Sequence, residues 1–398
     1  MEFTRPRGTR DFLPEEVKGR RKVENIIRDT FEKFGYQEVI TPVFENLELI
    51  TAKSGDEIRQ GLYHFKDKSD RDLALRPELT APVMRLYVNE MQKMPKPVKL
   101  YYIANCFRYE RTQSGRFREF WQAGVESIGS GHPEAEAEVI ALAVQTLENL
   151  GLKNFEVQIG HIGILRGILE EEGVSEAEQN ALMGMIDKGG KEQLEEAIAK
   201  FSKESSEILL QIVELEGKPQ DVLDKATELL KEKENPRAKI SQLKDILDML
   251  NSFGVKDYQV NLGIARGLDY YTGMVFEIYA EKLGAQDQIC GGGSYTLAEA
   301  LGGEKTATSG FAFGFDRVLL ALEAQGVLPQ EDIDTKYLVV PTSSDQLKKA
   351  IEISMMLRRQ SHAEADLMKR KLKKALAYAN TRDIPFVVIV GEEELKRE

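Results

Sequence analysis

The sequence contains little cysteine: Cys106 and Cys290 are the only two thiols among 398 residues, and they lie far apart. A disulfide framework or a cysteine-based zinc site would need more thiols at closer spacing. The four histidines show no ligand spacing such as H-E-x-x-H. The sequence therefore predicts no protein-bound transition metal, and its low thiol content fits a reducing compartment such as the cytoplasm.

Long apolar runs are also absent, since no segment approaches the roughly 20 residues that a membrane-spanning helix needs. The N-terminal segment MEFTRPRGTRDFLP lacks the apolar core of a signal peptide, so we expect a cytoplasmic protein with no membrane partner. The formal net charge of −12 argues against a protein that coats nucleic acid indiscriminately. A specific nucleic-acid partner, bound through a local basic patch, stays open.

The first part of the chain shows helical and strand-like patterns. Pro14 at the first helical position, an apolar face and Gly35 at the end predict a helix over 15–34. The next segment, YQEVITPVF, predicts a strand at 36–44, and its Pro42 places that strand at a sheet edge that borders another subunit. The patterns further along predict a helix at 133–150 and strands at 98–105, 119–128 and 155–160.

The chain changes character after residue 174. Residues 174–253 are rich in Glu, Lys, Leu and Ala with helical periodicity, which predicts a helical insertion into a first domain of residues 1–325. Residues 326–336 are expected to form a linker, and residues 337–398 alternate strand and helix like a small α/β domain. The joint RRQSHAEADL lacks the glycine expected after a helix, and the chain stops just past a strand. We therefore expect residues to be missing near 360 and after 398.

An arginine-rich loop lies in the stretch RYERTQSGRFREFWQ, and its four arginines are Arg108, Arg111, Arg116 and Arg118. The guanidinium fork suits phosphate oxygens, and an aromatic ring offers a flat face to a base. Arg108 and Phe120, on the two arms of one hairpin, are therefore candidates for holding a phosphate and an adenine. No G-x-x-x-x-G-K-[ST] or G-x-G-x-x-G loop offers another phosphate site. Taken alone, such a loop is more often a solvated hairpin whose arginines pair with Glu110 and Glu119.

Several segments resemble those of class II aminoacyl-tRNA synthetases. FRYERTQSGRFREF is similar to motif 2 of that class, GFAFGFDRVLLAL to motif 3, and the helix at 15–34 with its following strand to the dimer-forming motif 1. PRGTRDFLP, LRPELTAP, ARGLDYYTG and GGGSY resemble the histidyl-tRNA synthetase family in particular, over nearly the whole chain. HIGI at 161–164 resembles the class I motif H-I-G-H, but the last histidine and a K-M-S-K-S partner are absent. We predict an ordinary strand-to-helix turn there.

The resemblance implies an α+β fold: a class II catalytic core with an antiparallel sheet flanked by helices, the helical insertion, and a C-terminal α/β anticodon-binding domain. It implies a histidine–tRNA ligase that makes histidyl-adenylate and pyrophosphate from L-histidine and ATP, with Mg²⁺ bound to the phosphates. Histidine would then pass to the 3′ end of tRNA(His). The motif 1 likeness implies a homodimer.

The resemblance also implies roles for single residues. Arg108 and Arg266 would be catalytic at the α-phosphate, where preorganised guanidiniums suit the developing charge. The implied ATP-binding residues are Arg108, Arg116, Phe120 and Arg317. The implied histidine-binding residues are Glu78, Thr80, Gln122, Glu126, Arg266, Tyr271 and Tyr295, with Glu126 and Tyr271 at the two ring nitrogens. The implied tRNA contacts are Gln113 and Arg118 in the motif 2 loop and Lys369, Arg370 and Lys373 on a helix at 368–379.

These residues have ordinary structural alternatives. Glu78 stands before a helical pattern and, taken alone, is more often a helix cap. Tyr270 and Tyr271 could be core aromatics of a strand, and alternation lets only one of them face a pocket. Arg317 lies near a helix start, where a cation is unfavourable unless an anion binds there. The basic run at 369–374 is typical of a solvated helix face. We favour the functional roles because each residue stands at its family position.

One departure from the family and two rival functions stay open. The family commonly has arginine, tyrosine and aspartate after the glycines, whereas this chain has Ser294, Tyr295 and Thr296, so Ser294 receives no role. One rival is a synthetase paralogue that binds histidine and regulates histidine biosynthesis without ligating it. Such proteins lack the tail domain and usually the RGLDYY segment, and this chain has both. The other rival is a tRNA-binding or histidine-sensing module without activity, against which the intact arginines argue.

Overall fold

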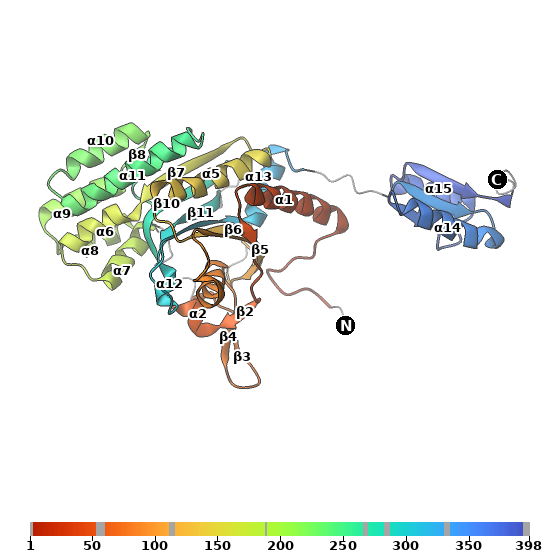
Figure 1. Cartoon of the computed structure of the whole chain (residues 1–398), viewed down its shortest axis with the longest axis horizontal. Helices are drawn as coiled ribbons and strands as arrows, with labels where there is room; N and C mark the ends of the chain where they lie inside the picture. Colours follow the sequence, from red (N-terminus) through yellow and green to blue (C-terminus); the bar gives the residue numbers. More distant parts are fainter. Residues whose placement is uncertain are drawn as a thin grey trace. The chain divides into compact units, whose positions relative to one another are not determined.

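The structure is a computed structural model that describes residues 3–52, 60–110, 116–187, 189–265, 270–281, 287–329 and 335–392. Two compact units make up the chain, Met1–Pro329 and Gln330–Glu398. Within the described ranges, the first unit holds a nine-stranded and a three-stranded sheet, and the second holds another three-stranded sheet (Figure 1). None of the described helices is long and apolar enough to cross a membrane.

The large sheet of the first unit has the order β1-β5-β6-β12-β11-β10-β7-β9-β8. The bounds along the sheet are β1 Gln37–Glu38, β5 Val98–Phe107, β6 Glu119–Ile128, β12 Thr308–Gly314, β11 Gln288–Tyr295, β10 Tyr271–Ala280, β7 Phe155–His161, β9 Gln259–Asn261 and β8 Glu216–Gly217. The central strands from β5 to β7 pair antiparallel, while β1 and β9 pair parallel with their inner neighbours. This confirms the predicted antiparallel core, including the hairpin arms at 98–105 and 119–128.

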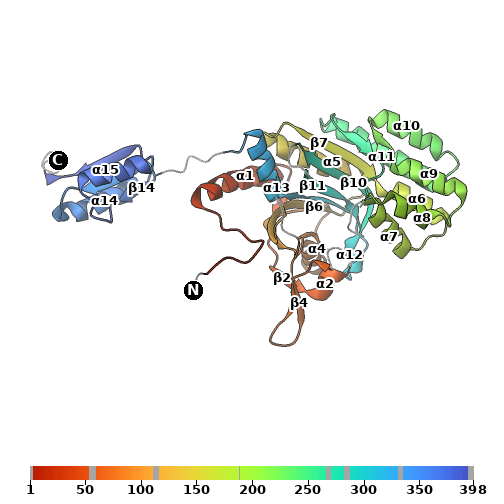
Figure 2. The same ribbon diagram turned by 180° about the vertical axis from the view of Figure 1, so that it is seen from behind.

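Helices cover both faces of this sheet, as the views from opposite sides show (Figures 1 and 2). The helices of the core are α1 Pro14–Lys33, α2 Leu47–Thr51, α4 Thr80–Leu86 with a following π-helical turn, α5 Pro133–Asn149, α6 Ile162–Glu171, α12 Leu297–Ala300 and α13 Phe315–Gln325. Phe31 of α1 meets Phe311 of β12 with ring centroids 5.8 Å apart, and α5 packs beside α1 on the same strands. α4 begins at the opposite face, where Thr80 lies close to Glu126.

The segment at 174–253 is built mainly of helices, as its periodicity predicts. They are α7 Glu176–Asp187, α8 Lys191–Ile198, α9 Lys203–Val213, α10 Pro219–Leu229 and α11 Glu234–Ser252. α11 packs along α5 and α6, so apolar residues such as Leu243 and Leu250 are fully buried there. The segment also contributes β8, the outermost strand of the large sheet.

The expected strand at 36–44 is wrong. β1 covers only Gln37–Glu38 at the sheet edge, and the chain then leaves to form β2, Phe44–Asn46. β2 pairs with β4 (Asp72–Leu75), and β4 pairs with β3 (His64–Lys66), all antiparallel. Pro42 has no N–H for a ladder, and the Arg76 guanidinium binds the carbonyls of Thr41 and Pro42 at 2.8 and 3.2 Å. Between β1 and β2, the Arg76 side chain thus binds backbone carbonyls that a neighbouring strand would otherwise bind.

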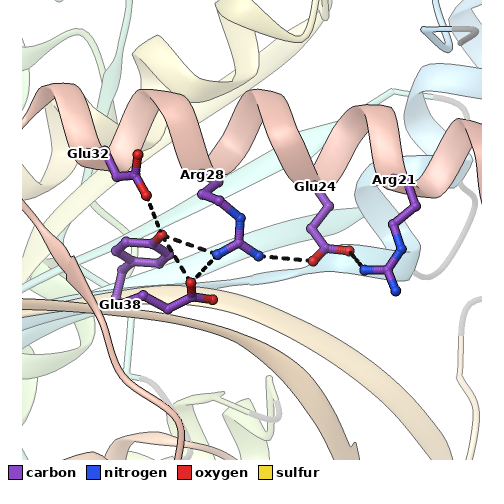
Figure 3. A network of polar contacts seen from close by, with 6 residues as sticks. Arg21, Glu24, Arg28, Glu32 and Glu38 are labelled. Carbon is purple, nitrogen blue, oxygen red and sulfur yellow. Dashed lines mark hydrogen bonds and ion pairs between the residues drawn. The ribbon is translucent and has the colours of Figure 1, made fainter. Parts of the chain in front are cut away.

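A polar network holds α1 against the sheet edge (Figure 3). Arg28 on α1 bonds to Glu24 at 3.0 Å and forms an ion pair with Glu38 of β1. The hydroxyl of Tyr101, on β5, donates to Glu32 of α1 at 2.8 Å. One helix face therefore contacts both β1 and β5, which fixes the N-terminal helix beside the strands that carry the arginine-rich hairpin.

The second unit confirms the predicted α/β alternation. Its elements are β13 Tyr337–Pro341, a 3₁₀ turn Ser344–Gln346, α14 Leu347–Leu357, β14 Ala363–Ala365, α15 Leu372–Thr381 and β15 Phe386–Val390. The strands run parallel in the order β14-β13-β15. The expected helix at 368–379 is wrong at its start, because Lys369 has a positive φ of 51° and the Arg370 N–H donates to Asp366 at 2.6 Å. Lys369 and Arg370 therefore precede α15 and do not lie on its face.

Candidate active site

One face of the central strands carries the proposed histidine-binding side chains. Strand alternation places Phe120, Gln122 and Glu126 of β6 on the same side. Glu126 is opposite Gly310 of β12, which is opposite Gly293 of β11. A Cβ added at Gly310 would lie 2.0 Å from Glu126 Oε2, so only glycine leaves room for the carboxylate. The glycines therefore form the floor on which the Glu126 side chain lies.

Glu126 is a buried acid among tyrosine hydroxyls. Its side chain is 1% exposed; Oε1 accepts from Tyr102 at 3.2 Å, and Oε2 accepts from Tyr295. Burial raises the pKa of Glu126 to about 8, although the hydrogen bond from Tyr295 acts in the opposite direction. A carboxyl group whose pKa lies close to neutral pH can either donate a hydrogen bond to an imidazole nitrogen or accept one from it.

Three tyrosine rings, those of Tyr270, Tyr271 and Tyr295, lie together beside this acid. Tyr270 lies 5.1 Å from Tyr271 and 5.0 Å from Tyr295 between ring centroids, and Tyr271 lies 6.2 Å from Tyr295. The prediction that only one of Tyr270 and Tyr271 can face the pocket is wrong, because both rings meet Tyr295. β10 begins at Tyr271, so Tyr270 precedes the strand and alternation does not apply to it.

Glu78 and Thr80 lie at the start of α4. The Glu78 carboxylate accepts the backbone N–H groups of Thr80 at 2.5 Å and Ala81 at 3.0 Å, so it caps the helix as the structural alternative predicts. Burial raises the pKa of Glu78, while these hydrogen bonds and the nearby Arg108 lower it. Gln122 accepts from the Cys106 thiol at 3.4 Å. A role of Glu78, Thr80 and Gln122 toward an amino group stays a prediction.

Three arginines lie close together near Phe120 and Glu78. Arg108 donates to the Pro77 carbonyl at 2.8 Å, and its guanidinium lies 5.3 Å from the Phe120 ring centroid. Arg317 donates to the Gln288 carbonyl at 2.7 Å. Burial, followed by the positive charge of Arg116, lowers the pKa of Arg317, and Arg108 acts in the same direction. The positive charges of these guanidiniums repel one another. A polyphosphate bound between them, beside the aromatic ring, would stabilise this arrangement.

The alternative of a salt-bridged hairpin holds only in part. Arg116 lies 3.7 Å from Glu110, but Glu119 accepts from Asn105 at 3.0 Å. The Arg118 guanidinium packs 3.9 Å from the Tyr109 ring centroid. Arg266 and Gln113 lie outside the described residues.

The residues of the second unit that are expected to contact tRNA differ from one another in exposure and in contacts. Arg370 forms an ion pair with Asp366, and its guanidinium lies 4.0 Å from the Tyr378 ring centroid. Lys369 and Lys373 are exposed. Arg370 therefore has a structural partner, whereas the two lysines present their charge to solvent.

Two further groups of residues belong to the site and were not predicted. Tyr102 faces Glu126 because alternation on β5 and the hairpin register bring them together, a signal that the sequence contained. Asp316, at the start of α13, is 4% exposed and pairs with Arg10 at 2.8 Å and Arg20 at 2.7 Å. Its second carboxylate oxygen accepts a hydrogen bond from the backbone N–H of Trp121 at 2.9 Å. Asp316 thus joins the helix that carries Arg317 to the strand that carries Phe120.

The described residues include no group of three or more His, Cys, Asp or Glu side chains suited to a metal ion. A magnesium ion bound to ATP phosphates needs no such group, because Mg²⁺ keeps several waters and binds largely through its substrate. The geometry therefore describes a buried acid bonded to tyrosine hydroxyls, and a cluster of arginines near Phe120 on the same strand.

Comparisons with known proteins find related sequences and structures over nearly the whole chain. A family model described as histidyl-tRNA synthetase matches residues 8–318, and one described as anticodon binding domain matches residues 336–398. A histidine–tRNA ligase of Methanocaldococcus jannaschii is 49% identical over 99% of this chain and 93% of the relative. A solved histidyl-tRNA synthetase from Nostoc sp. PCC 7120 has a TM-score of 0.80 and 25% identity, covering 100% of this chain and 93% of that chain. A solved ATP phosphoribosyltransferase regulatory subunit/histidyl-tRNA synthetase from Bacillus halodurans has a TM-score of 0.82 and 25% identity, covering 98% and 99%.

Proposed function

The chain belongs to the histidyl-tRNA synthetase family, and from this premise we propose how its residues ligate histidine to tRNA(His). The chain is an aminoacyl-tRNA synthetase, a ligase that consumes ATP. The observation that supports the residue roles best is the buried Glu126, which is bonded to two tyrosine hydroxyls and lies on the strand whose other end carries Phe120 beside Arg108.

Histidine would bind with its imidazole between Glu126 and Tyr271. The hydroxyls of Tyr102 and Tyr295 keep the Glu126 carboxyl in place, so that it meets a ring N–H without reorganising. Glu78, Thr80 and Gln122 would hold the α-amino group. An apolar amino acid would leave these buried groups unpaired, and this is the basis of its rejection.

ATP would bind with its adenine on Phe120. Arg108 would contact the α-phosphate, and Arg116 and Arg317 the β- and γ-phosphates. A histidine carboxylate oxygen attacks the α-phosphorus, the bond to the bridging oxygen breaks, and pyrophosphate leaves. Mg²⁺ bound to the phosphates would neutralise the charge of the leaving group. Arg108 and Arg266 would stabilise the charge on the α-phosphoryl oxygens.

The second step transfers the histidyl group to tRNA. A terminal ribose hydroxyl of tRNA(His) attacks the histidyl carbonyl, and AMP leaves. Gln113 and Arg118 would contact the acceptor end, while Lys369, Arg370 and Lys373 would contact the phosphate backbone elsewhere. A homodimer through the α1 region and a cytoplasmic location complete the proposal.

Histidine-dependent ATP–pyrophosphate exchange tests the first step. Arg108→Ala should reduce exchange at least about 100-fold, the typical cost of losing one donor to a developing charge. Arg237→Ala is the matched control, because Arg237 is exposed on α11, away from the proposed site and from α1. Arg266→Ala should behave like Arg108→Ala.

The outcome also separates the ligase from its rival. Folded protein that binds histidine without any exchange would favour a regulatory paralogue. Exchange that requires histidine, followed by charging of tRNA(His), would support both proposed steps.

A further inference from the structure

A cavity lies on the opposite face of the sheet from Glu126. Its volume is about 340 Å³, and we call it the His161 cavity, after a lining that includes Glu136, His161, Lys239, Gln242, Ser294 and Ser309. Ser294 and Tyr295 are neighbours on β11, but Ser294 bonds to Glu136 of α5 whereas Tyr295 bonds to Glu126. Tyr295 also borders the His161 cavity, but strand alternation directs its hydroxyl to Glu126 on the other face of the sheet.

Two buried side chains of the cavity carry polar atoms that have no hydrogen-bond partner among the described residues. His161 is 2% exposed, and neither ring nitrogen finds a hydrogen bond among the described residues, although Gln242 is near enough to influence its pKa. Glu136 is 3% exposed; the Ser294 hydroxyl donates to its Oε1 and the Met274 N–H lies near enough to lower its pKa, while Oε2 has no hydrogen-bond partner among the described residues. Buried polar groups are nearly always hydrogen-bonded, so two such groups facing one cavity point to a ligand.

The charges around the cavity define the ligand. Burial, followed by the charge of Lys239, lowers the pKa of His161 to about 4, so the imidazole is neutral and offers one donor and one acceptor. Burial raises the pKa of Glu136, and Lys239 lowers it electrostatically. One cavity wall therefore presents a carboxyl oxygen that needs a donor, and another presents an ammonium that favours an anion.

We propose that the His161 cavity binds a small zwitterion, namely a free α-amino acid. Its ammonium group would donate to Glu136 Oε2 and to the acceptor nitrogen of His161. Its carboxylate would meet Lys239 and the Gln242 carboxamide, with the exposed Lys305 at the mouth adding a second positive charge. A purely anionic ligand would face Glu136 and a purely cationic one would face Lys239, so a ligand with both charges matches the lining best.

Saturation-transfer NMR on the full chain tests this site. The probes are the L-α-amino acids of proteins other than histidine, each added singly, because histidine is assigned to the opposite face. At least one should bind to the native chain. Glu136→Gln should weaken that binding at least about tenfold, since a hydrogen bond to a charged group is lost. Ser294→Arg should abolish it by filling the cavity with a side chain that pairs with Glu136.

Two controls make the result decisive. Ser252→Arg adds the same charge on an exposed part of α11, and binding should equal that of the native chain. Glu126→Gln alters the histidine pocket and should leave the second site intact. Binding that survives both Glu136→Gln and Ser294→Arg, or the absence of binding by every probe, would overturn the proposal. If Ser294→Arg does not fold, Lys239→Met replaces it and should also lower affinity about tenfold.

Discussion

Replacing Glu126 by glutamine should remove a pH dependence from the stability of the first unit. The pKa of the buried carboxyl is about 8, raised from an ordinary value of 4.5 by burial. The folded chain therefore keeps this proton up to about pH 8, whereas the unfolded chain releases it near pH 4.5. The stabilisation by this group is full below the unfolded pKa and is lost as the pH rises through the folded pKa.

The magnitude follows from that difference. Between about pH 6 and about pH 8 the unfolded carboxyl is ionised and the folded one is still mostly protonated. At about 1.4 kcal/mol per pH unit, the native chain should lose about 2.5 kcal/mol of unfolding free energy through this group. Glutamine has the same shape and can still accept a tyrosine hydroxyl, so Glu126→Gln should lack this loss.

Urea unfolding at the two pH values measures the difference. Trp121, the only tryptophan of the sequence, lies on β6 and reports the first unit by its fluorescence. Other buried acids such as Glu78 and Glu136 are present in both proteins, so their contributions cancel when the two losses are subtracted. Equal losses in the native chain and in Glu126→Gln would refute the view of Glu126 as a protonated buried acid.

Three further outcomes follow from the site. Tyr295→Phe removes a hydroxyl that donates to Glu126, so histidine affinity measured by calorimetry should fall about tenfold, and an unchanged affinity would contradict the pocket. Asp316→Asn weakens two buried ion pairs and should cost about 3 kcal/mol in urea unfolding, whereas a cost below about 1 kcal/mol would make the anchor unimportant. Gly310→Ala should eliminate histidine binding because its Cβ would displace the Glu126 carboxylate, while Gly184→Ala, with nothing within 4 Å, should bind normally.

The elements that sequence patterns predicted well are those with local causes. α1 begins at Pro14, where Glu16 also accepts the Leu13 N–H at 2.8 Å, and β6 spans the predicted range of 119–128. An apolar periodicity bounded by proline and glycine is enough for such elements. The hairpin argument also places Arg108 near Phe120 correctly, since antiparallel arms bring their ends together.

The errors arise where a distant side chain decides the backbone. The expected strand through Pro42 is interrupted because Arg76 binds the carbonyls there, and no local pattern around Pro42 contains that information. The start of α15 is set by Asp366, which binds the Arg370 N–H before the helix begins. Asp316 resembles an ordinary first-turn acid in the sequence, yet it joins Arg10, Arg20 and β6. Such contacts require the folded register.

Ser294 and Tyr295 are neighbours in the sequence with different partners in the structure. Residues 294 and 295 lie on opposite faces of β11, so the Ser294 hydroxyl bonds to Glu136 while the Tyr295 hydroxyl bonds to Glu126. A short side chain at position 294 therefore leaves space beside His161 and Lys239 and takes nothing from the histidine pocket. If that space holds an amino acid, the bound molecule would contact β11, the strand that also positions Tyr295. Histidine affinity should then change when the probe that binds the His161 cavity is present, and Ser294→Arg should remove this coupling.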